Sequence, residues 1–305
     1  MKLAITGGAG FIGRWLADAA LAAGHEVSLI GRRGHVRYIE FAGSVFPYRP
    51  TDYRVDGLVE AIGPCDAIVH LAAERFGGTA RFDLFEENLR LTRAVLETAQ
   101  HLSVDCIVML SSTAVYSSAN PHPWQEFIYP SPNSLYGAAK LAAEALSDLM
   151  ARSARLHLKQ LRAASVLGHG ERPGGAAMTF IQRAYSGQPL EVWGAGRQRR
   201  EYIYVKDVAD AVLAALNRHC PAGVYNVGTG VDISIVELAT LVNQVFDNRA
   251  GLVTRSVDQE FSGEGFMDIQ KAREIMGWRP FWSLEAALAD IRTLMVAGSH
   301  GVKYG

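Results

Sequence analysis

The sequence predicts an α/β fold built on a doubly wound parallel sheet, with a second, smaller α/β unit. Three observations predict it. An uninterrupted apolar run at residues 2–6 leads into a glycine-rich turn and then a helical pattern. Short apolar runs then alternate with helical patterns through the first half of the chain, as in parallel sheets covered on both faces. This alternation breaks down in the second half, which indicates a differently built unit.

The first strand, residues 2–6, precedes a turn with glycines at 7, 8, 10 and 13 and a helical pattern over 14–21. Strand, glycine turn and helix start occur in the order that a dinucleotide site needs. The glycines permit a tight turn and close approach of backbone to a pyrophosphate, which the helix N–H groups then bind. We therefore expect a Rossmann-type domain and a nucleotide at this turn. The residues expected to contact it are Gly7, Gly10, Phe11, Ile12 and Gly13.

The second strand, residues 26–30, ends at a position where a dinucleotide fold often holds a carboxylate for the ribose 2′-hydroxyl. This chain has Gly31, Arg32 and Arg33 there instead. Because guanidinium groups bind phosphate in a bidentate manner, the two arginines favour NADP(H), with NAD still possible. The alternative is a basic surface turn.

The next strands predict the rest of the dinucleotide site. Asp52 and Tyr53 lie where a third strand would end, either beside the adenine or in an exposed loop. The strand over residues 67–73 ends in Leu71, Ala72 and Ala73, all expected to contact the cofactor, and the small alanines leave room for its backbone. We interpret His70 in this strand as structural.

A catalytic group is predicted from one strand and the helix that follows it. The strand over residues 105–110 leads into Ser112 and Thr113, and the helix is predicted over 134–152. That helix begins with Tyr136 and Lys140, which lie one turn apart on one face. An ammonium at this distance stabilises a phenolate and makes tyrosine usable as a base. Ser112 would hold the substrate oxygen. Tyr202 and Lys206 have the same spacing, but the strand expected over 201–205 would separate them by about 13 Å.

The remaining pattern divides the chain into two expected domains. Strands are predicted over 157–166, 201–205 and 224–227, a glycine-rich loop over 168–175, and helices over 84–100, 176–186, 233–246, 269–276 and 284–294. Residues 1–166 and 201–228 are assigned to the Rossmann domain. Residues 167–200 and 229–305 are assigned to the substrate domain.

The composition is that of an ordinary soluble globular protein. The chain has 305 residues and a formal net charge of −1, which argues against a nucleic-acid surface. No segment resembles a targeting signal or a membrane span, so the cytoplasm is expected. The nine histidines and three cysteines show no metal-ligand spacing, and no metal is predicted. The basic run at residues 197–200 is either a solvated turn or an anion site.

Several motifs in this order resemble the extended short-chain dehydrogenases/reductases, in the group of NAD(P)-dependent nucleotide-sugar epimerases and dehydratases. They are TGGAGFIG (6–13), HLAA (70–73), SSTAVY (111–116), YGAAK (136–140), LRAASVLG (161–168), VWGAGRQRREYIYVKDVADAV (192–212), VYNVGTG (224–230) and MGWRPFWSLEAAL (276–288). The resemblance implies a Ser112, Tyr136 and Lys140 triad supported by Asn88. Tyr136 and Lys140 are also expected to contact the cofactor, and Ser112 and Thr113 the substrate. It also implies that Arg200 binds the diphosphate of a nucleotide sugar.

The departures from this family pattern narrow the reaction. Thr113 and Ala114 replace the Asp-Glu pair of the dehydratases, which argues against dehydration. Ala163 replaces a usual proline, and no second phosphate-binding arginine is evident near residues 262–264. The expected function is a nucleotide-sugar 4-epimerase or 4-ketoreductase. The alternatives are a reductase of a non-sugar carbonyl compound and, against the intact triad, a silent dinucleotide-binding regulator.

The resemblance and the helix pattern also imply a homodimer. The helices at residues 88–100 and 136–152 carry apolar and small side chains on more than one face, so that one face would need a partner. The side chains in question are Leu89, Val95, Leu96, Leu141, Ala145 and Leu149.

Overall fold

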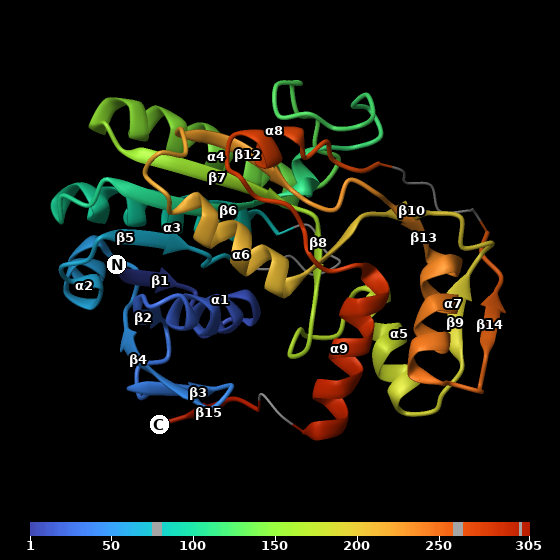
Figure 1. Cartoon of the computed structure of the whole chain (residues 1–305). Coiled ribbons are helices and arrows are strands. Elements are labelled where there is room, and N and C mark those ends of the chain that lie inside the picture. Colours follow the sequence, from blue (N-terminus) through green and yellow to red (C-terminus); the bar gives the residue numbers. More distant parts are fainter. Residues whose placement is uncertain (75–80, 259–264, 299–300) are drawn as a thin grey trace.

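A nine-stranded, mostly parallel sheet runs through the larger part of the molecule (Figure 1). The computed structural model describes residues 1–74, 81–258, 265–298 and 301–305. In spatial order the strands are β12 (Gly223–Val227), β7 (His157–Ala163), β6 (Cys106–Ser112), β5 (Ala67–His70), β1 (Lys2–Thr6), β2 (Glu26–Gly31), β4 (Ser44–Pro50), β3 (Tyr38–Phe41) and β15 (Lys303–Tyr304). The strands from β12 to β4 pair in parallel, whereas β3 and β15 pair antiparallel. The predicted fold class is confirmed.

Helices cover both faces of this sheet because the buried strands are apolar on both sides. In β1, Leu3 and Ile5 pack into one core and Ala4 into the other. On the first face lie α1 (Phe11–Ala22) and α6 (Val205–Ala215), which pack on each other. On the second face α3 (Phe82–His101) lies between α2 (Val55–Ile62) and α4 (Leu135–Ala154).

The strand order reverses at β1, which has β2 on one side and β5 on the other. In open α/β sheets a ligand crevice forms at such a point, beyond the carboxyl ends of the strands. The glycine turn follows β1 and the segment from Leu71 to Ala73 follows β5. The topology therefore brings these two predicted cofactor segments to the same edge.

A second, smaller layered unit lies beside the carboxyl edge of the sheet (Figure 1). It contains β9 (Leu190–Trp193) paired with β14 (Leu252–Arg255), and β10 (Arg199–Arg200) paired with β13 (Ile233–Ser234). Its helices are α5 (Ala176–Tyr185), α7 (Ile235–Phe246) and α9 (Leu284–Ala297), with α7 packed on both others. The short helix α8 (Gln270–Glu274) contacts β12 of the main sheet.

Two predicted strands differ from the structure. The run at 157–166 divides into β7 and β8 (Ser165–Leu167), because the chain changes partners after Ala164. The N–H of Ala164 still donates to the Val227 carbonyl of β12, whereas the N–H of Ser165 donates to the Glu201 carbonyl next to β11. The strand expected at 201–205 ends at Tyr204 in β11 (Tyr202–Tyr204), which pairs with β8. The helix α6 begins at Val205. Lys206 is therefore helical and its Nζ donates to Asp290, 2.8 Å away.

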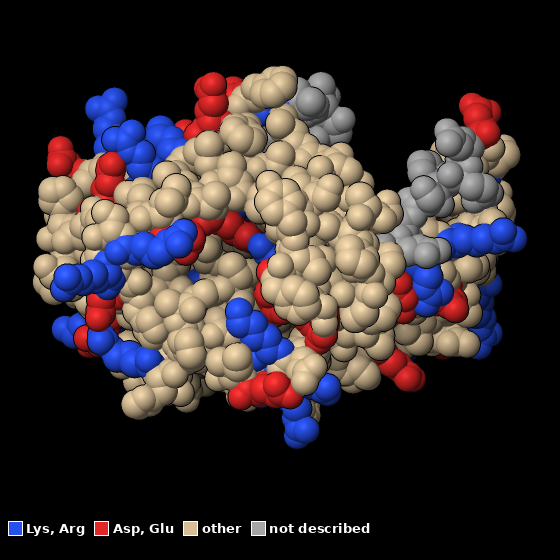
Figure 2. Space-filling model, turned by 90° about the horizontal axis from the view of Figure 1, so that it is seen from above, with Lys and Arg blue, Asp and Glu red and all other residues tan. Residues whose placement is uncertain are grey.

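The charged surface is mixed rather than one-sided. Figure 2 shows Lys and Arg beside Asp and Glu on the face seen from above, with uncharged residues between them. Among the described helices, none is long and apolar enough to cross a membrane. In the same described residues, no group of three or more His, Cys, Asp and Glu side chains could hold a metal ion.

Candidate active site

The glycine turn lines a cleft of about 820 Å³ at the reversal point of the sheet. Gly7 has a φ of +72°, and a Cβ there would lie 2.7 Å from the backbone N of Ala72. A Cβ on Gly13 would lie 2.6 Å from the carbonyl oxygen of Gly7, so helix and turn approach too closely for any side chain. Among the described residues no side chain caps α1, and its first turn contains no acidic residue. The turn and helix start therefore fit the pyrophosphate of a dinucleotide.

Of the cofactor residues predicted in the glycine turn and at the ends of the first strands, the structure brings all but one together in this cleft. Its lining includes Gly7, Gly10, Phe11, Ile12, Gly13, Arg32, Arg33, Tyr53, Leu71, Ala72 and Ala73. The exception is Asp52, which is exposed and accepts a hydrogen bond from the backbone N of Arg54 at 2.8 Å. Asp52 therefore organises the turn before α2. The structure favours the exposed-loop alternative for this residue over a place beside the adenine.

Tyr53, by contrast, is a buried part of the cleft floor. It is 2% exposed, has a φ of +60°, and its hydroxyl accepts a hydrogen bond from the backbone N of Gly7 at 3.2 Å. Burial raises the pKa of its phenol to about 12, so it stays protonated at neutral pH. Tyr53 thereby joins the end of β4 to the glycine turn.

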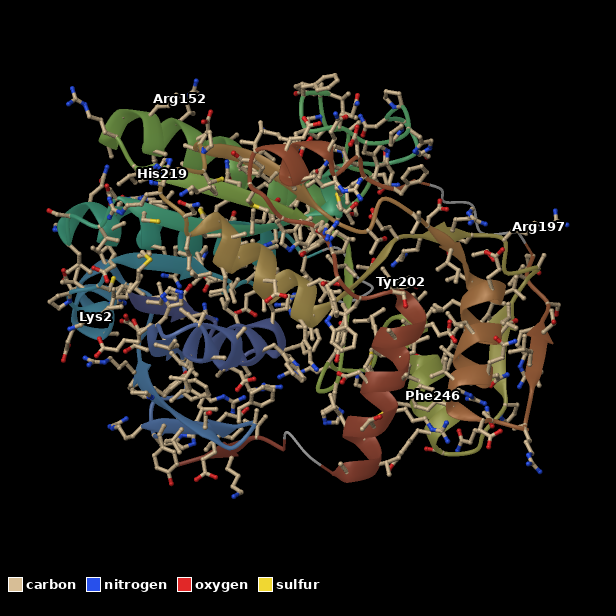
Figure 3. The ribbon with its side chains drawn as sticks, in the orientation of Figure 1. Lys2, Arg152, Arg197, Tyr202, His219 and Phe246 are labelled. Atoms are coloured by element: carbon tan, nitrogen blue, oxygen red, sulfur yellow. The ribbon has the colours of Figure 1, made fainter. Side chains whose placement is uncertain are left out.

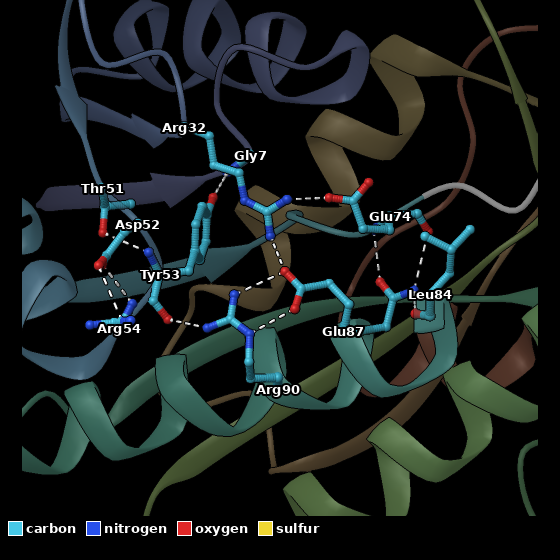
Figure 4. Close-up of polar contacts among 11 residues, drawn as sticks. Gly7, Arg32, Thr51, Asp52, Tyr53, Arg54, Glu74, Leu84, Glu87 and Arg90 are labelled. Atoms are coloured by element: carbon cyan, nitrogen blue, oxygen red, sulfur yellow. Dashed lines mark hydrogen bonds and ion pairs between the residues drawn. The ribbon is translucent and has the colours of Figure 1, made fainter. Parts of the chain in front are cut away.

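An ion-pair network holds Arg32 at the α3 side of the cleft (Figure 4). Its guanidinium pairs with Glu74 and Glu87, and its Cζ lies 5.4 Å from the ring centroid of Tyr53. Arg90 also pairs with Glu87 at 2.7 Å and donates to the carbonyl of Tyr53 at 2.9 Å. No carboxylate was expected from the sequence at this end of the cleft. Two reach it, from the loop after β5 and from α3.

Tyr136 and Lys140 occupy the first two turns of α4, which Ser134 caps by accepting from the N–H of Gly137 at 3.1 Å. The Lys140 Nζ lies 5.9 Å from the Tyr136 ring centroid and donates to the carbonyl of Leu110 at 2.9 Å. Both side chains line a cavity of about 20 Å³, room for one water, together with Asn88. Ala72 and Ala73 line this cavity and the dinucleotide cleft alike, so the two spaces adjoin.

Asn88 is buried and fixed on both sides of its amide. Its Oδ1 accepts from the N–H of Glu74 at 2.8 Å, while its Nδ2 donates to the carbonyl of Leu84 at 2.8 Å. Asn88 therefore joins α3 to the segment after β5, beside the cavity that Tyr136 and Lys140 line.

Ser112 ends β6 and begins the short 3-10 helix η1 (Thr113–Val115). Its Oγ accepts from the N–H of Ala114 at 3.1 Å. The first turn of α4 packs directly on this segment, since a Cβ on Gly137 would lie 2.0 Å from the Ala114 carbonyl oxygen. The Thr113 Oγ1 is buried and has no hydrogen-bond partner in the described part of the chain. Ser112 and Thr113 are thus held against the start of the tyrosine helix.

A buried ion pair, not predicted from the sequence, anchors the second half of this helix. Glu144 and Arg162 pair at 2.7 Å, with side chains 6% and 5% exposed. Ser111 donates its hydroxyl to Glu144, and Arg162 donates to the Tyr116 hydroxyl at 2.6 Å. The sequence contains one sign of this pair: Glu144 lies one turn beyond Lys140 on the same helix face. These bonds fix α4 on β6 and β7.

Arg200 lies in β10, in the second unit, and is exposed. Its neighbours in the sequence do not neutralise it. Glu201 accepts instead from the backbone N of Thr229, Gly230 and Met267. Asp207 accepts from the backbone N of Phe281 and Trp282.

A pocket of about 440 Å³ is lined partly by residues that precede Arg200 in the sequence. Its lining includes Phe180, Trp193, Arg197 and Gln198. Figure 3 shows Arg197 at the outer end of the second unit and Tyr202 nearer the main sheet. The residues near 262–264, where a second arginine was sought, lie outside the described residues.

Comparisons with known proteins agree with this architecture. A family model described as NAD dependent epimerase/dehydratase family matches residues 3–228. The UDP-glucose 4-epimerase of Mycolicibacterium smegmatis is 30% identical over 95% of this chain and 96% of its own length. The structure of UDP-N-acetylglucosamine 4-epimerase from Bacillus cereus has a TM-score of 0.87 and 29% identity, covering 97% of this chain and 96% of that one. UDP-glucose 4-epimerase of Thermus thermophilus, in complex with NAD, has a TM-score of 0.82 and 27% identity, covering 96% and 98%.

Proposed function

This chain belongs to the NAD dependent epimerase/dehydratase family, and we propose that it is a nucleotide-sugar 4-epimerase or 4-ketoreductase. As a member it is an NAD(P)-dependent enzyme of the extended short-chain dehydrogenase/reductase type. One observation carries the proposal: Tyr136 and Lys140 line a cavity that adjoins the dinucleotide cleft through Ala72 and Ala73. Thr113 and Ala114 stand where a dehydratase would have its acidic pair, which favours reactions without loss of water.

In the proposed mechanism the bound nicotinamide supplies hydride transfer to or from a sugar carbon. Tyr136 exchanges the proton of the sugar hydroxyl, and Lys140 stabilises its phenolate from one helical turn away. Ser112 holds the same oxygen through its hydroxyl. Asn88 is a positioning residue, which keeps α3 and the segment after β5 in register beside this group.

The choice between NADP(H) and NAD depends on Arg33 more than on Arg32. The prediction of NADP(H) relied on two guanidiniums, but Arg32 is paired with Glu74 and Glu87. We keep NADP(H) as the proposed cofactor on the strength of Arg33, which lines the cleft. The proposed domains remain residues 1–166 and 201–228 for the cofactor, and 167–200 and 229–305 for the substrate.

A thermal-shift screen tests the function. Nucleotide sugars, including UDP-glucose and UDP-N-acetylglucosamine, are added to the protein in the presence of NADPH or NADH. A ligand at a hundred times its dissociation constant stabilises the fold by about 2.7 kcal/mol, so a true substrate should raise Tm clearly. Stabilisation by no nucleotide sugar, together with oxidation of NADPH by non-sugar carbonyl compounds, would replace this proposal with the reductase.

A further inference from the structure

Three arginines from distant segments line the cleft near one another. Arg14 comes from α1, Arg33 follows β2, and Arg172 lies in the loop after β8. Tyr304 of β15 joins them, because β15 pairs with β3 at the sheet edge. All four side chains line the same cleft as the glycine turn.

Arg14 is the fixed member of this group. It is 8% exposed, its Nη1 donates to the carbonyl of Ala9 in the glycine turn at 2.8 Å, and its Cζ lies 5.6 Å from the ring centroid of Phe41. Its Nε is buried and has no hydrogen-bond partner among the described residues. A buried guanidinium donor without a partner is costly unless a ligand satisfies it.

The charges around these three arginines are unbalanced. Within the described residues, the two carboxylates that reach the cleft, Glu74 and Glu87, are both paired with Arg32. The guanidinium of Arg33 lies over the Tyr304 ring, with Cζ 4.2 Å from the centroid. Burial lowers the pKa of Arg14, and the charges of Arg33 and Arg172 lower this pKa further. Tyr304 acts in the opposite direction and raises it. Three cations therefore line a part of the cleft in which no described carboxylate is left to balance them.

We propose that Arg14, Arg33 and Arg172 form a phosphate-monoester site that takes the 2′-phosphate of NADP(H), with Tyr304 covering it. The site rests on the proposed function, since it assumes a dinucleotide in the cleft. Arg33 follows β2, at whose end this type of fold holds the adenosine ribose. Guanidinium groups suit phosphate oxygens in particular. The choice between NADP(H) and NAD would then depend on this cluster and on Tyr304, rather than on Arg32.

The test measures dissociation constants for NADPH and NADH with the wild type, Arg33→Gln and Arg172→Gln. Arg37→Gln is the matched control, because Arg37 is exposed on the same loop and donates to Gly34 and Val36. NADPH binding should weaken roughly tenfold to a hundredfold in the two cluster variants, with NADH binding unchanged. The control should bind both cofactors as the wild type does.

Equal binding of NADPH and NADH by the wild type, or equal weakening of both in the variants, would overturn the site. NADPH and NADH could bind the wild type equally while inorganic phosphate alone raises the Tm of the wild type but not of Arg33→Gln. In that case the cluster binds free phosphate, and the 2′-phosphate assignment is wrong. Failure of both dinucleotides to bind would instead overturn the proposed function itself.

Discussion

At the scale of single residues, substitution of Arg200 tests whether the substrate is a nucleotide sugar or another carbonyl compound. Its carboxylate neighbours Glu201 and Asp207 accept hydrogen bonds from backbone N–H groups of other segments. We expect Arg200→Ala to weaken nucleotide-sugar binding by about tenfold to a hundredfold, because a bidentate contact to a diphosphate is lost. NADPH binding should barely change, and titration calorimetry measures both.

The matched control for Arg200 is Arg199→Ala. Arg199 is the neighbouring residue of β10, but it pairs with Asp232 at 2.8 Å and Glu237 at 3.3 Å. Its loss should cost some stability and leave substrate binding nearly unchanged. An Arg200→Ala enzyme that keeps its substrate KM would favour the non-sugar reductase.

At the scale of elements, Gly137 sets how closely α4 approaches η1. Gly137→Ala would put a Cβ 2.0 Å from the Ala114 carbonyl oxygen, in a contact that only movement of α4 or η1 can relieve. We expect a loss of about 1–3 kcal/mol in unfolding free energy and a large fall in kcat, since Tyr136 and Ser112 move apart. Urea unfolding and steady-state kinetics check the two effects.

Gly34→Ala is the control for this substitution, because a Cβ at Gly34 would meet no atom of the described residues within 4 Å. It should leave both stability and kcat near those of the wild type. Normal kcat in Gly137→Ala would mean that the contact between α4 and η1 does not position the catalytic group.

His70, at the end of β5, makes the sheet sensitive to acid. It is 4% exposed, and its Nδ1 lies 2.7 Å from the Thr6 Oγ1. Burial, and then the charge of Lys140, lower its pKa from 6.5 to about 3. Between these values the unfolded chain binds one proton more than the folded chain. This residue's contribution to stability is therefore complete above pH 6.5 and falls by up to about 1.4 kcal/mol per pH unit below it.

His70→Gln removes this titration while keeping a hydrogen-bonding side chain. Urea unfolding between pH 7 and pH 4.5 should show the stability advantage of the wild type shrinking as the pH falls. Parallel pH profiles for the two proteins would show that His70 does not carry this dependence.

The elements predicted correctly were those with a strong local pattern. The buried strands β1, β2, β5 and β6 are rich in apolar residues, and α4 follows a polar loop with a serine cap. The helix α6 was missed because the alternating Tyr202–Tyr204 strand runs directly into it without a side-chain cap. The edge strand β15 and its neighbour β3 are short, and both residues of β15 are exposed, so their sequences carry little pattern.

At the scale of the whole molecule, the site could be predicted only where its residues belong to local motifs. The glycine turn, Ser112, Tyr136 and Lys140 each follow from neighbouring residues. Glu74, Glu87 and Tyr304 reach the cleft only through the tertiary fold, from segments whose sequences give no sign of it. For this reason the sequence did not predict that Arg32 pairs with Glu74 and Glu87. The proposal of NADP(H) therefore rests on Arg33 instead.

The homodimer also belongs to this scale and remains a prediction. Of the side chains expected to form its interface, Val95 and Leu96 are fully buried in the chain's own core. Leu149, 64% exposed, and Ala145 remain on the outer face of α4, with Leu89 and Leu141 half-buried. Light scattering at micromolar concentration should give the mass of two chains. Leu149→Glu should shift it towards one, because a carboxylate would be buried in the interface. A wild-type monomer would contradict the prediction.

The central claim is that Tyr136 assists hydride transfer at the sugar carbon, and a substrate deuterated at C4 tests it most directly. The nucleotide sugar selected by the thermal-shift screen is incubated with enzyme and cofactor, and the label is followed by NMR and mass spectrometry. The proposed mechanism predicts deuterium on C4 of the product or on the nicotinamide, a primary isotope effect on turnover, and no transfer by Tyr136→Phe despite normal cofactor binding. Deuterium released to water, or a Tyr136→Phe enzyme with near-normal kcat, would contradict it.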